Sequence, residues 1–304
     1  MKKLCSIFFM LIMAMQVFCE DYKERYEYLM KLERFSEAKK HLKIWQEAAP
    51  ENPEVFFAYF NFYTRKGRSK NTSVDLYNKD TDVGFSLVGK KEDTVLAYIN
   101  NGFRYDADYI NEAFMYMDRG LELAPNRLDM YFNRIDLLGK TENYAKQAER
   151  IIEILRASKE PKRNWVWENE YISPIKIKDI VLSKSEKYYR LWLGAKTKET
   201  LHSAVICGKA QIELYPKEFS GYKTLGSALT IRGDYEKALL YCLKGEHLNN
   251  FDEANILNIA TCYENIENKT NARAYYKKLL KSEDARMRSF ANKKLKHLNQ
   301  SAGY

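Results

Sequence analysis

Two amphipathic segments flank a tight turn within residues 219–250, and this pattern constrains the fold more than any other part of the sequence. Apolar residues recur at helical spacing on both sides of the turn. Gly233 and Asp234 form the turn, because glycine ends a helix in the left-handed conformation and aspartate caps the next helix. Gly226 and Ala238 stand at matching heights, so the two predicted helices can approach closely. The stretch therefore predicts a helix–turn–helix unit.

The unit repeats with a period of 34 residues. A shift by that period places Ala238 on Ala204 upstream and on Ala272 downstream. This period, with a small residue at each helix crossing, is the signature of tetratricopeptide repeats (TPR). Residues 185–280 therefore resemble three consecutive TPR units, and the resemblance implies an all-α, TPR-like α-solenoid.

The three units do not match the family equally well. The unit that begins at Ser185 matches it at Tyr188, Leu191 and Pro216, but it has Trp192 where the family has glycine. The unit that begins at Glu253 keeps a small residue at both helix crossings.

The front half of the chain interrupts the helical pattern. Residues 68–80 are polar and turn-rich, and two β-rich runs follow at 83–88 and 94–99. The runs predict an inserted β-hairpin that ends at 100–102 and separates the two helices of one unit. Its edges are a candidate site for β-augmentation, or the hairpin only fills space. The predicted divisions are 1–19 signal peptide, 20–67 TPR-like helices, 68–104 insertion, 105–158 TPR-like helices, 159–176 aromatic loop and 177–304 TPR array with a capping helix.

The N-terminus has the pattern of an export signal. Lys2 and Lys3 precede an apolar run over residues 4–15 that is too short to span a bilayer. We expect cleavage after Cys19; the alternative is a lipoprotein in which Cys19 is acylated. With this layout the chain resembles exported, uncharacterised TPR proteins of Gram-negative envelopes. We therefore expect a secreted protein that is periplasmic or envelope-associated and has no transmembrane span.

Nothing in the sequence completes a catalytic, cofactor or metal site. Residues 84–90 have the spacing of a nucleotide-binding P-loop, but Lys91 stands where a serine or threonine would ligate magnesium, and the segment looks like a strand that another strand follows. The four histidines are far apart, and no His or Cys follows at metal-ligand spacing. Cys207, Cys242 and Cys262 fall on inward helix faces and are expected to be buried thiols. The formal charge is +9 with acidic and basic residues interspersed, which is typical of a solvated helical surface and not of a nucleic-acid footprint. We expect no enzyme, no cofactor and no nucleic-acid partner.

The TPR resemblance implies a concave groove lined by the first helix of each unit. The groove candidates are Tyr189, Leu193, Lys196, Lys223, Ser227, Thr230, Leu257, Thr261 and Glu264. Some TPR proteins hold a terminal carboxylate in this groove. Lys223 and Asn258 stand at suitable positions for such a clamp, but Ser227 replaces an expected asparagine, so the clamp is not assigned.

The segment 165–171 is a second candidate site. It carries Trp165, Trp167 and Tyr171, and exposed aromatic rings are strong interface and sugar-stacking groups. The tryptophans can equally anchor a long loop onto the helices. The sequence thus predicts a non-catalytic scaffold that binds a protein or peptide; the alternative is a glycan-binding repeat protein that uses the aromatic loop.

Overall fold

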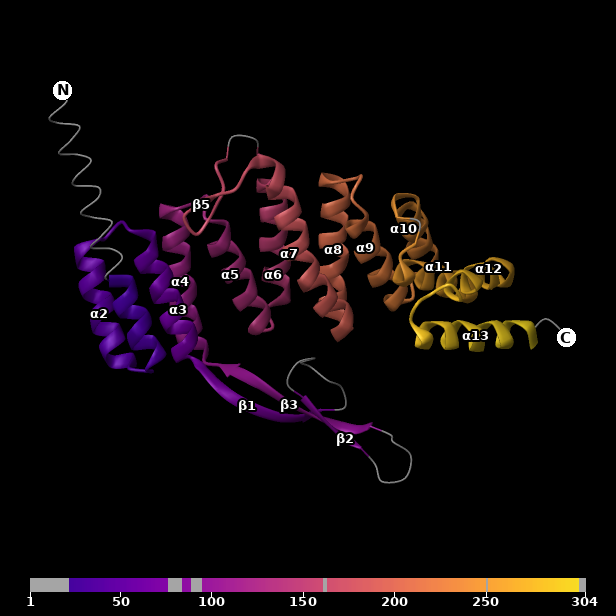
Figure 1. Cartoon of the computed structure of the whole chain (residues 1–304), viewed down its shortest axis with the longest axis horizontal. Helices are drawn as coiled ribbons and strands as arrows, with labels where there is room; N and C mark the ends of the chain where they lie inside the picture. Colours follow the sequence, from indigo (N-terminus) through magenta and orange to yellow (C-terminus); the bar gives the residue numbers. More distant parts are fainter. Residues whose placement is uncertain (1–21, 76–83, 89–94, 161–162, 250, 301–304) are drawn as a thin grey trace. The chain divides into compact units, whose positions relative to one another are not determined.

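The computed structural model describes residues 22–75, 84–88, 95–160, 163–249 and 251–300 (Figure 1). They form two compact units. Unit 1 holds the described residues up to Leu137 together with Asn164–Tyr171, and unit 2 holds Leu138–Arg163 together with the described residues from Ile172 onward. The expected signal peptide at 1–19 lies outside the described residues and stays a prediction.

Unit 1 is built from helix pairs. Its elements are a helical stretch at 22–31, α2 (Phe35–Ala48), α3 (Pro53–Lys66), α4 (Ala107–Leu123) and most of α5 (Leu128–Lys140). Asn52 caps α3 by accepting a hydrogen bond from the Glu54 N–H at 2.9 Å, and Pro53 supplies the preset φ of a first helical residue. Tyr59 of α3 stacks on Tyr116 of α4 with ring centroids 4.3 Å apart. The core of unit 1 is therefore strongly aromatic where α3 meets α4.

The insertion between α3 and α4 is a three-stranded antiparallel sheet. Its strands β1 (Arg68–Asp75), β2 (Gly84–Val88) and β3 (Val95–Tyr105) lie in the order β1-β3-β2. The two expected strands are present. The expectation of turns throughout 68–80 is wrong for β1, and so is the expected end of the hairpin at 100–102. β3 continues to Tyr105 because the whole of β1 pairs with it, from Arg68 opposite Tyr105 to Asp75 opposite Tyr98. Pairing with a partner strand decides the conformation of such polar segments more than intrinsic β-propensity does.

Unit 2 is a row of consecutive helices, and the all-α class is thereby confirmed. The helices are α6 (Tyr144–Ala157), α7 (Pro174–Ala195), α8 (Lys198–Leu214), α9 (Phe219–Arg232), α10 (Tyr235–Leu248), α11 (Glu253–Asn265), α12 (Lys269–Leu279) and α13 (Ala285–Gln300). The starts of α9 and α11 are 34 residues apart, as are those of α10 and α12. Ala204, Ala238 and Ala272 are all fully buried, as the repeat predicts.

A glycine permits the close approach of α9 and α10 in unit 2. A Cβ atom added to Gly226 of α9 would overlap the Sγ of Cys242 on α10. Gly233 ends α9 in the left-handed conformation with φ 83°, as the sequence predicts. Glycine is therefore required at position 226 for steric reasons and at position 233 for its left-handed backbone conformation.

The helix pair of α7 and α8 does not follow the 34-residue period of the later pairs. Left-handed residues follow α7, α9 and α11 at Lys196, Gly233 and Glu267, and these positions are 37 and 34 residues apart. With three extra residues, the buried place of Leu225 is taken by Tyr188 and not by Leu191, which is 58% exposed. The expected match at Leu191 is therefore wrong, although the helix pair itself is present.

Candidate functional site

Two side-chain contacts join α9 to α11. The helices α7, α9 and α11 are the first helices of their pairs, and the surface that they form is called here the first-helix face of unit 2. The ammonium group of Lys223 lies 2.8 Å from the carboxylate of Asp252, which also caps α11. One helical turn further along α9, the Asn258 side-chain amide donates to the Ser227 hydroxyl at 2.8 Å. Lys223, Ser227 and Asn258 are all half-buried. Lys223, Ser227 and Asn258 thus form one polar row, which includes two of the expected groove residues, Lys223 and Ser227.

Glu264 lies in the same helix as Asn258 but is already occupied. Its carboxylate accepts from the Lys294 ammonium group of α13 at 2.9 and 3.0 Å and from the Tyr276 hydroxyl at 2.5 Å. Burial, and then the hydrogen bond to Glu264, raise the pKa of Tyr276 above its usual range. A partner could reach Glu264 only by displacing these groups, so this residue stabilises the end of the array.

The other expected groove residues divide by burial. Leu193, Leu257 and Thr261 are half-buried, and Lys196 is exposed at the left-handed end of α7. Thr230 is buried, and its hydroxyl donates to the backbone oxygen of Gly226 at 2.8 Å. Its assignment to an open groove surface is therefore wrong.

Tyr189 is also wrongly assigned to the groove. It is 1% exposed, because the 37-residue spacing gives it the helix-crossing place that Gly226 holds in α9. The same spacing gives Glu186 and Arg190 the places of Lys223 and Ser227. Glu186 is half-buried and Arg190 is exposed, so these two residues extend the first-helix face onto α7.

The aromatic loop is a small hairpin in unit 1. Its strands β4 (Val166–Trp167) and β5 (Glu170–Tyr171) pair antiparallel, and Glu168 turns the chain with φ 55°. Trp165 is 2% exposed and meets the ring of Tyr131 edge-on at 5.9 Å. A fully buried indole cannot stack on a sugar, so Trp165 is an anchor and not a binding residue.

The other two rings of the loop differ from each other. Trp167 is half-buried and stacks on Phe132 with centroids 6.3 Å apart. Tyr171 is 61% exposed. A single exposed ring remains of the three that the glycan alternative invoked, and the structure thereby removes most of that alternative's support.

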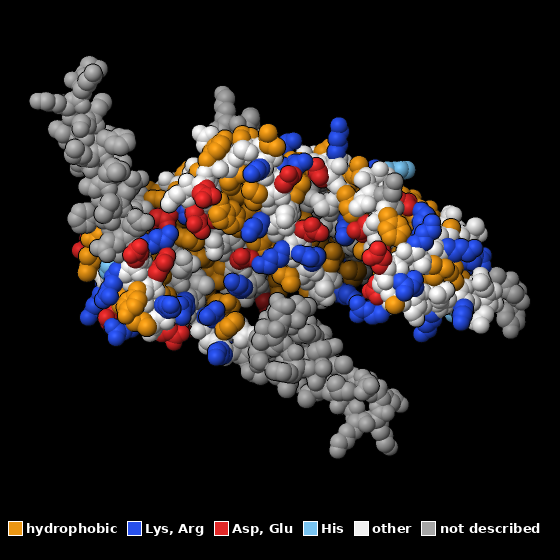
Figure 2. Space-filling model, viewed as in Figure 1, with side chains coloured by type: hydrophobic (Ala, Val, Ile, Leu, Met, Phe, Trp, Pro, Cys, Tyr) orange, Lys and Arg blue, Asp and Glu red, His pale blue; other side chains and the backbone are white. Residues whose placement is uncertain are grey.

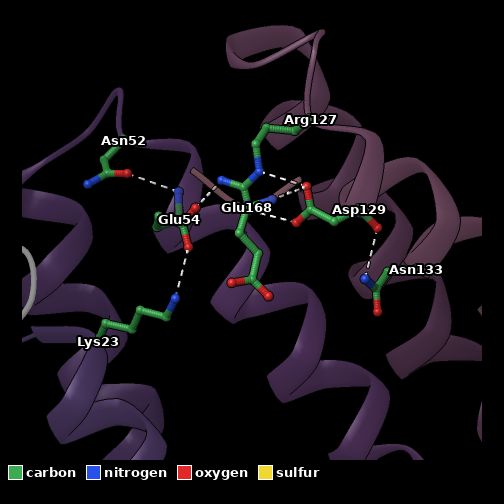
Figure 3. A network of polar contacts seen from close by, with 7 residues as sticks. All are labelled: Lys23, Asn52, Glu54, Arg127, Asp129, Asn133 and Glu168. Atoms are coloured by element: carbon green, nitrogen blue, oxygen red, sulfur yellow. Dashed lines mark hydrogen bonds and ion pairs between the residues drawn. The ribbon is translucent and has the colours of Figure 1, made fainter. Parts of the chain in front are cut away.

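The hairpin closes over a buried ionic network that the sequence reasoning missed (Figure 3). Arg127, just before α5, binds Asp129 in a bidentate manner, with Nε–Oδ1 and Nη2–Oδ2 distances of 2.9 and 2.8 Å. Its third nitrogen, Nη1, donates to Glu54 in the first turn of α3. Asp129 Oδ1 also accepts from the Glu168 backbone N–H at 3.0 Å. The network therefore fixes α3, the start of α5 and the hairpin turn together.

The charges of this network are balanced within unit 1. Arg127 and Asp129 have side chains 6% and 4% exposed, and Lys23 reaches the free oxygen of Glu54 at 3.5 Å. Burial alone would lower the pKa of Arg127, but the hydrogen bonds to Asp129 and Glu54 outweigh it and raise that pKa. Arg127 is thus a permanent cation that holds two carboxylates.

A pocket of about 170 Å³ opens beside the network. Its wall includes Lys23, Glu54 and Arg127 from the network, together with aromatic side chains from α2 and α3. The sequence carries only a weak signal for this pocket, which is an arginine and an aspartate close together at a helix start, 73 positions from Glu54. A 34-residue period cannot reveal a pair at that separation.

Charge on the surface follows no single sign. Figure 2 shows acidic and basic side chains interspersed on the face that it presents. Among the described residues, no helix is long and apolar enough to cross a membrane, and no three potential metal ligands gather.

Comparison with known proteins is uninformative at the sequence level, since no family model and no curated protein matches the chain. Solved structures give distant likenesses. PilW, a widely conserved type IV pilus biogenesis factor, is 12% identical with a TM-score of 0.38, over 90% of this chain and 97% of that one. PilF of Pseudomonas aeruginosa is 12% identical with a TM-score of 0.36, over 90% and 97%.

A likeness is also found outside bacteria. The yeast protein Tom70 is 12% identical with a TM-score of 0.32, over 89% of this chain and 60% of that one. Scores at this level carry no argument about function. The helix pairs, their 34-residue spacing in α9–α12 and the buried small residues at their crossings give this chain a TPR-like fold.

Proposed function

We propose that the chain is an exported, non-catalytic TPR-like scaffold of the bacterial envelope that binds a protein partner on the first-helix face of unit 2. The observation that carries the proposal is the polar row of Lys223, Ser227 and Asn258, whose members are half-buried and tied across α9 and α11. A surface fixed in this way loses little side-chain entropy when a partner binds.

The chemistry of this face favours a polypeptide partner. It offers the Ser227 hydroxyl and the Asn258 amide beside the Lys223–Asp252 ion pair, with the half-buried Leu257 on the same helix as Asn258. Such a surface can pair with backbone amides and carboxylates while its apolar part excludes water. On the face that Figure 2 presents, the charges of the described residues are interspersed and form no continuous basic stripe for a nucleic acid.

Export is supported by the sequence and is compatible with the cysteines. Lys2, Lys3 and the apolar run that follows have the layout of a signal segment. Cys207, Cys242 and Cys262 are free and buried, and burial raises the pKa of each thiol. Little thiolate is then available for disulfide exchange, so these cysteines are expected to remain free thiols in an oxidising compartment.

Photocrosslinking tests the binding face directly. A photoreactive residue replaces Ser227 on α9, and a matched control replaces Lys237, which is exposed on α10 of the same unit. We expect one defined protein adduct from Ser227 in living cells and none from Lys237. No adduct at Ser227, or the same adducts at both positions, would contradict the proposed face.

Cell fractionation tests export separately. When the full-length chain is expressed, we expect its product to appear in the envelope fraction with a new N-terminus at Glu20. Retention of acylated Cys19 would assign the lipid-anchored alternative, and an uncleaved cytoplasmic chain would contradict export without bearing on the binding face.

A further inference from the structure

The mixed charge of the surface has one exception, at the end of unit 2. Between Lys269 and Gln300 the chain has ten lysines and arginines and only two acidic residues, so this stretch carries +8 of the formal +9 of the whole chain. It forms α12 and α13. Figure 2 shows Lys and Arg side chains gathered over these two helices, at the right-hand end of the view. Attraction for an anionic partner is therefore concentrated at this end of the chain.

Some of these cations serve the fold. Lys278 of α12 lies 2.6 Å from the carboxylate of Glu246. Lys294 of α13 binds Glu264 at 2.9 and 3.0 Å, and Arg288 donates to two backbone oxygens of the turn before α13. These groups hold α12 and α13 in place and are not offered to a partner.

The two sides of α13 differ in character. Its inner side includes Ala291 and Leu298, which are buried in the core of the last helices. Its outer side carries Arg286, Lys293 and Lys296, all of them exposed. Among the described residues, the two ammonium groups meet no hydrogen-bond or ion-pair partner. The guanidinium group, on a side chain that is 94% exposed, pairs only with the aspartate two positions before it. Three cations on one outer surface are thus free or weakly held.

An aromatic ring lies among these cations. Phe290 is 42% exposed, although α13 has an inner side that could have covered it. One edge of the ring meets Tyr276 at a centroid distance of 6.4 Å, and the ammonium group of Lys294 lies 5.9 Å from its centre. Positions 286, 290, 293 and 297 recur at helical spacing, so the ring shares the outer side with the cations. An apolar ring beside lysines suits the boundary between lipid headgroups and acyl chains.

The outer side of α13 fits a fluid anionic surface better than a folded acidic protein. A folded protein holds its carboxylates in fixed places, and each lysine would lose rotamer freedom on pairing with one of them. Phospholipids diffuse within the bilayer and gather under a cluster of cations, so no matching geometry is required. Phe290 adds an apolar contact that a layer of carboxylates would not reward.

We propose that the outer side of α13 docks unit 2 on the surface of a membrane that contains anionic phospholipid. Arg286, Lys293 and Lys296 contact the phosphate groups, and Phe290 reaches below them. The inner side of α13 stays packed on α12, so the contact is peripheral and reversible and no helix enters the bilayer. The site uses none of the residues of the proposed face on α9 and α11, and it stands independently of that face.

The test measures co-sedimentation with vesicles, and the chain begins at Glu20 so that the apolar run at 4–15 cannot itself bind lipid. One set of vesicles is pure phosphatidylcholine, and the other is an equal mixture of phosphatidylcholine and phosphatidylglycerol. The α13 variant combines Arg286→Gln, Lys293→Gln and Lys296→Gln. The control variant removes the same charge from exposed lysines of α8 and α10, by Lys209→Gln, Lys237→Gln and Lys244→Gln.

We expect binding to the anionic vesicles alone, with loss of binding at about 1 M salt, where the Debye length is about 3 Å. Each cation near such a surface strengthens binding about fivefold, so the α13 variant should bind about 100-fold more weakly while the control variant binds nearly as the parent does. Equal binding to both kinds of vesicle, no binding to either, or equal loss in the two variants would overturn the site.

Two further measurements test the choice of lipid over another anion. Phe290→Ala should weaken vesicle binding severalfold, whereas Leu240→Ala, at a 52% exposed position of α10, should not. Equal effects of these two substitutions would contradict the place of the ring. Soluble polyglutamate or duplex DNA bound as tightly as the anionic vesicles would overturn the membrane assignment in favour of a soluble polyanion.

Discussion

Glu54 in the first turn of α3 and Arg127 just before α5 form an ion pair that spans 73 positions of the sequence, with Arg127 buried and Glu54 half-buried. Arg127 holds Asp129 with its other nitrogens. The pair therefore joins two helix starts through one guanidinium group.

Substitution of Arg127 by methionine should destabilise unit 1 by about 3–5 kcal/mol, because it leaves the buried carboxylate of Asp129 without a cation and leaves Glu54 with Lys23 alone. Urea unfolding followed by tryptophan fluorescence measures the change. Arg119→Met is the control: Arg119 pairs with Glu122 on the surface, and such pairs contribute only about 0–1 kcal/mol. Equal effects of the two substitutions would show that the buried network does not stabilise the unit.

The stacked tyrosines of unit 1 should make it sensitive to alkali. Burial, and then the nearby Tyr63 and Glu112, raise the pKa of Tyr116 to about 12 from 10.0. The folded chain then keeps a proton that the unfolded chain loses, so the free energy of unfolding falls as pH rises from about 10 to about 12. Tyr116→Phe should reduce this loss in thermal melts across that window.

The control for the alkaline prediction is Tyr171→Phe, because the Tyr171 ring is 61% exposed. This variant should retain the full loss of stability between pH 10 and pH 12. An unchanged pH dependence in Tyr116→Phe would contradict the assignment to that ring.

Two glycines of unit 2 should respond oppositely to alanine. Gly226→Ala places a methyl group against Cys242 Sγ and should destabilise the chain by about 1–3 kcal/mol. Gly194→Ala meets nothing within 4 Å on α7 and should stabilise it by up to about 1 kcal/mol, because alanine is the better helix former. Chemical unfolding gives both values.

A second substitution tests the cause of the Gly226 effect. Cys242→Ala removes the sulfur atom that the new methyl group would meet, so Gly226→Ala should cost less in that background. If the two effects simply add, the overlap with Cys242 is not the reason for the loss.

The three cysteines of unit 2 should not react with thiol reagents while the protein is folded. Burial raises the pKa of Cys207, Cys242 and Cys262, and each lies inside unit 2. A chain from Glu20 onward should react with Ellman's reagent only as it unfolds, at a rate that rises with urea concentration. Rapid labelling of one thiol without denaturant would contradict its burial.

The sequence predicted those parts of the fold that obey a short-range rule. The turn at Gly233, the buried Ala238 and the start of α11 all follow from one period and from helix capping. The helix pair of α7 and α8 was found but misaligned, because three extra residues rotate its buried stripe. That shift turned Tyr189 from an expected groove residue into a core residue.

The candidate site in unit 1 was out of reach for a different reason. Glu54, Arg127 and Glu168 come from three distant segments, and each looks like an ordinary surface charge in the sequence. Only packing brings them together. Trp165 shows the converse: an aromatic residue in a polar loop gave an interface prediction, whereas the folded loop uses it as an anchor.

The β insertion leaves and re-enters the helical chain at one point. The Asp106 N–H donates to the Gly67 backbone oxygen at 2.9 Å, and a Cβ on Gly67 would come within 2.6 Å of Tyr109 Cβ. The helices α3 and α4 are therefore already joined where the strands begin. Since loop-closure free energy grows only by about 0.6 kcal/mol for each doubling of length, this junction can tolerate segments of very different sizes. It is a natural splice point, at which evolution or an engineer can exchange the inserted module while the helical frame stays the same.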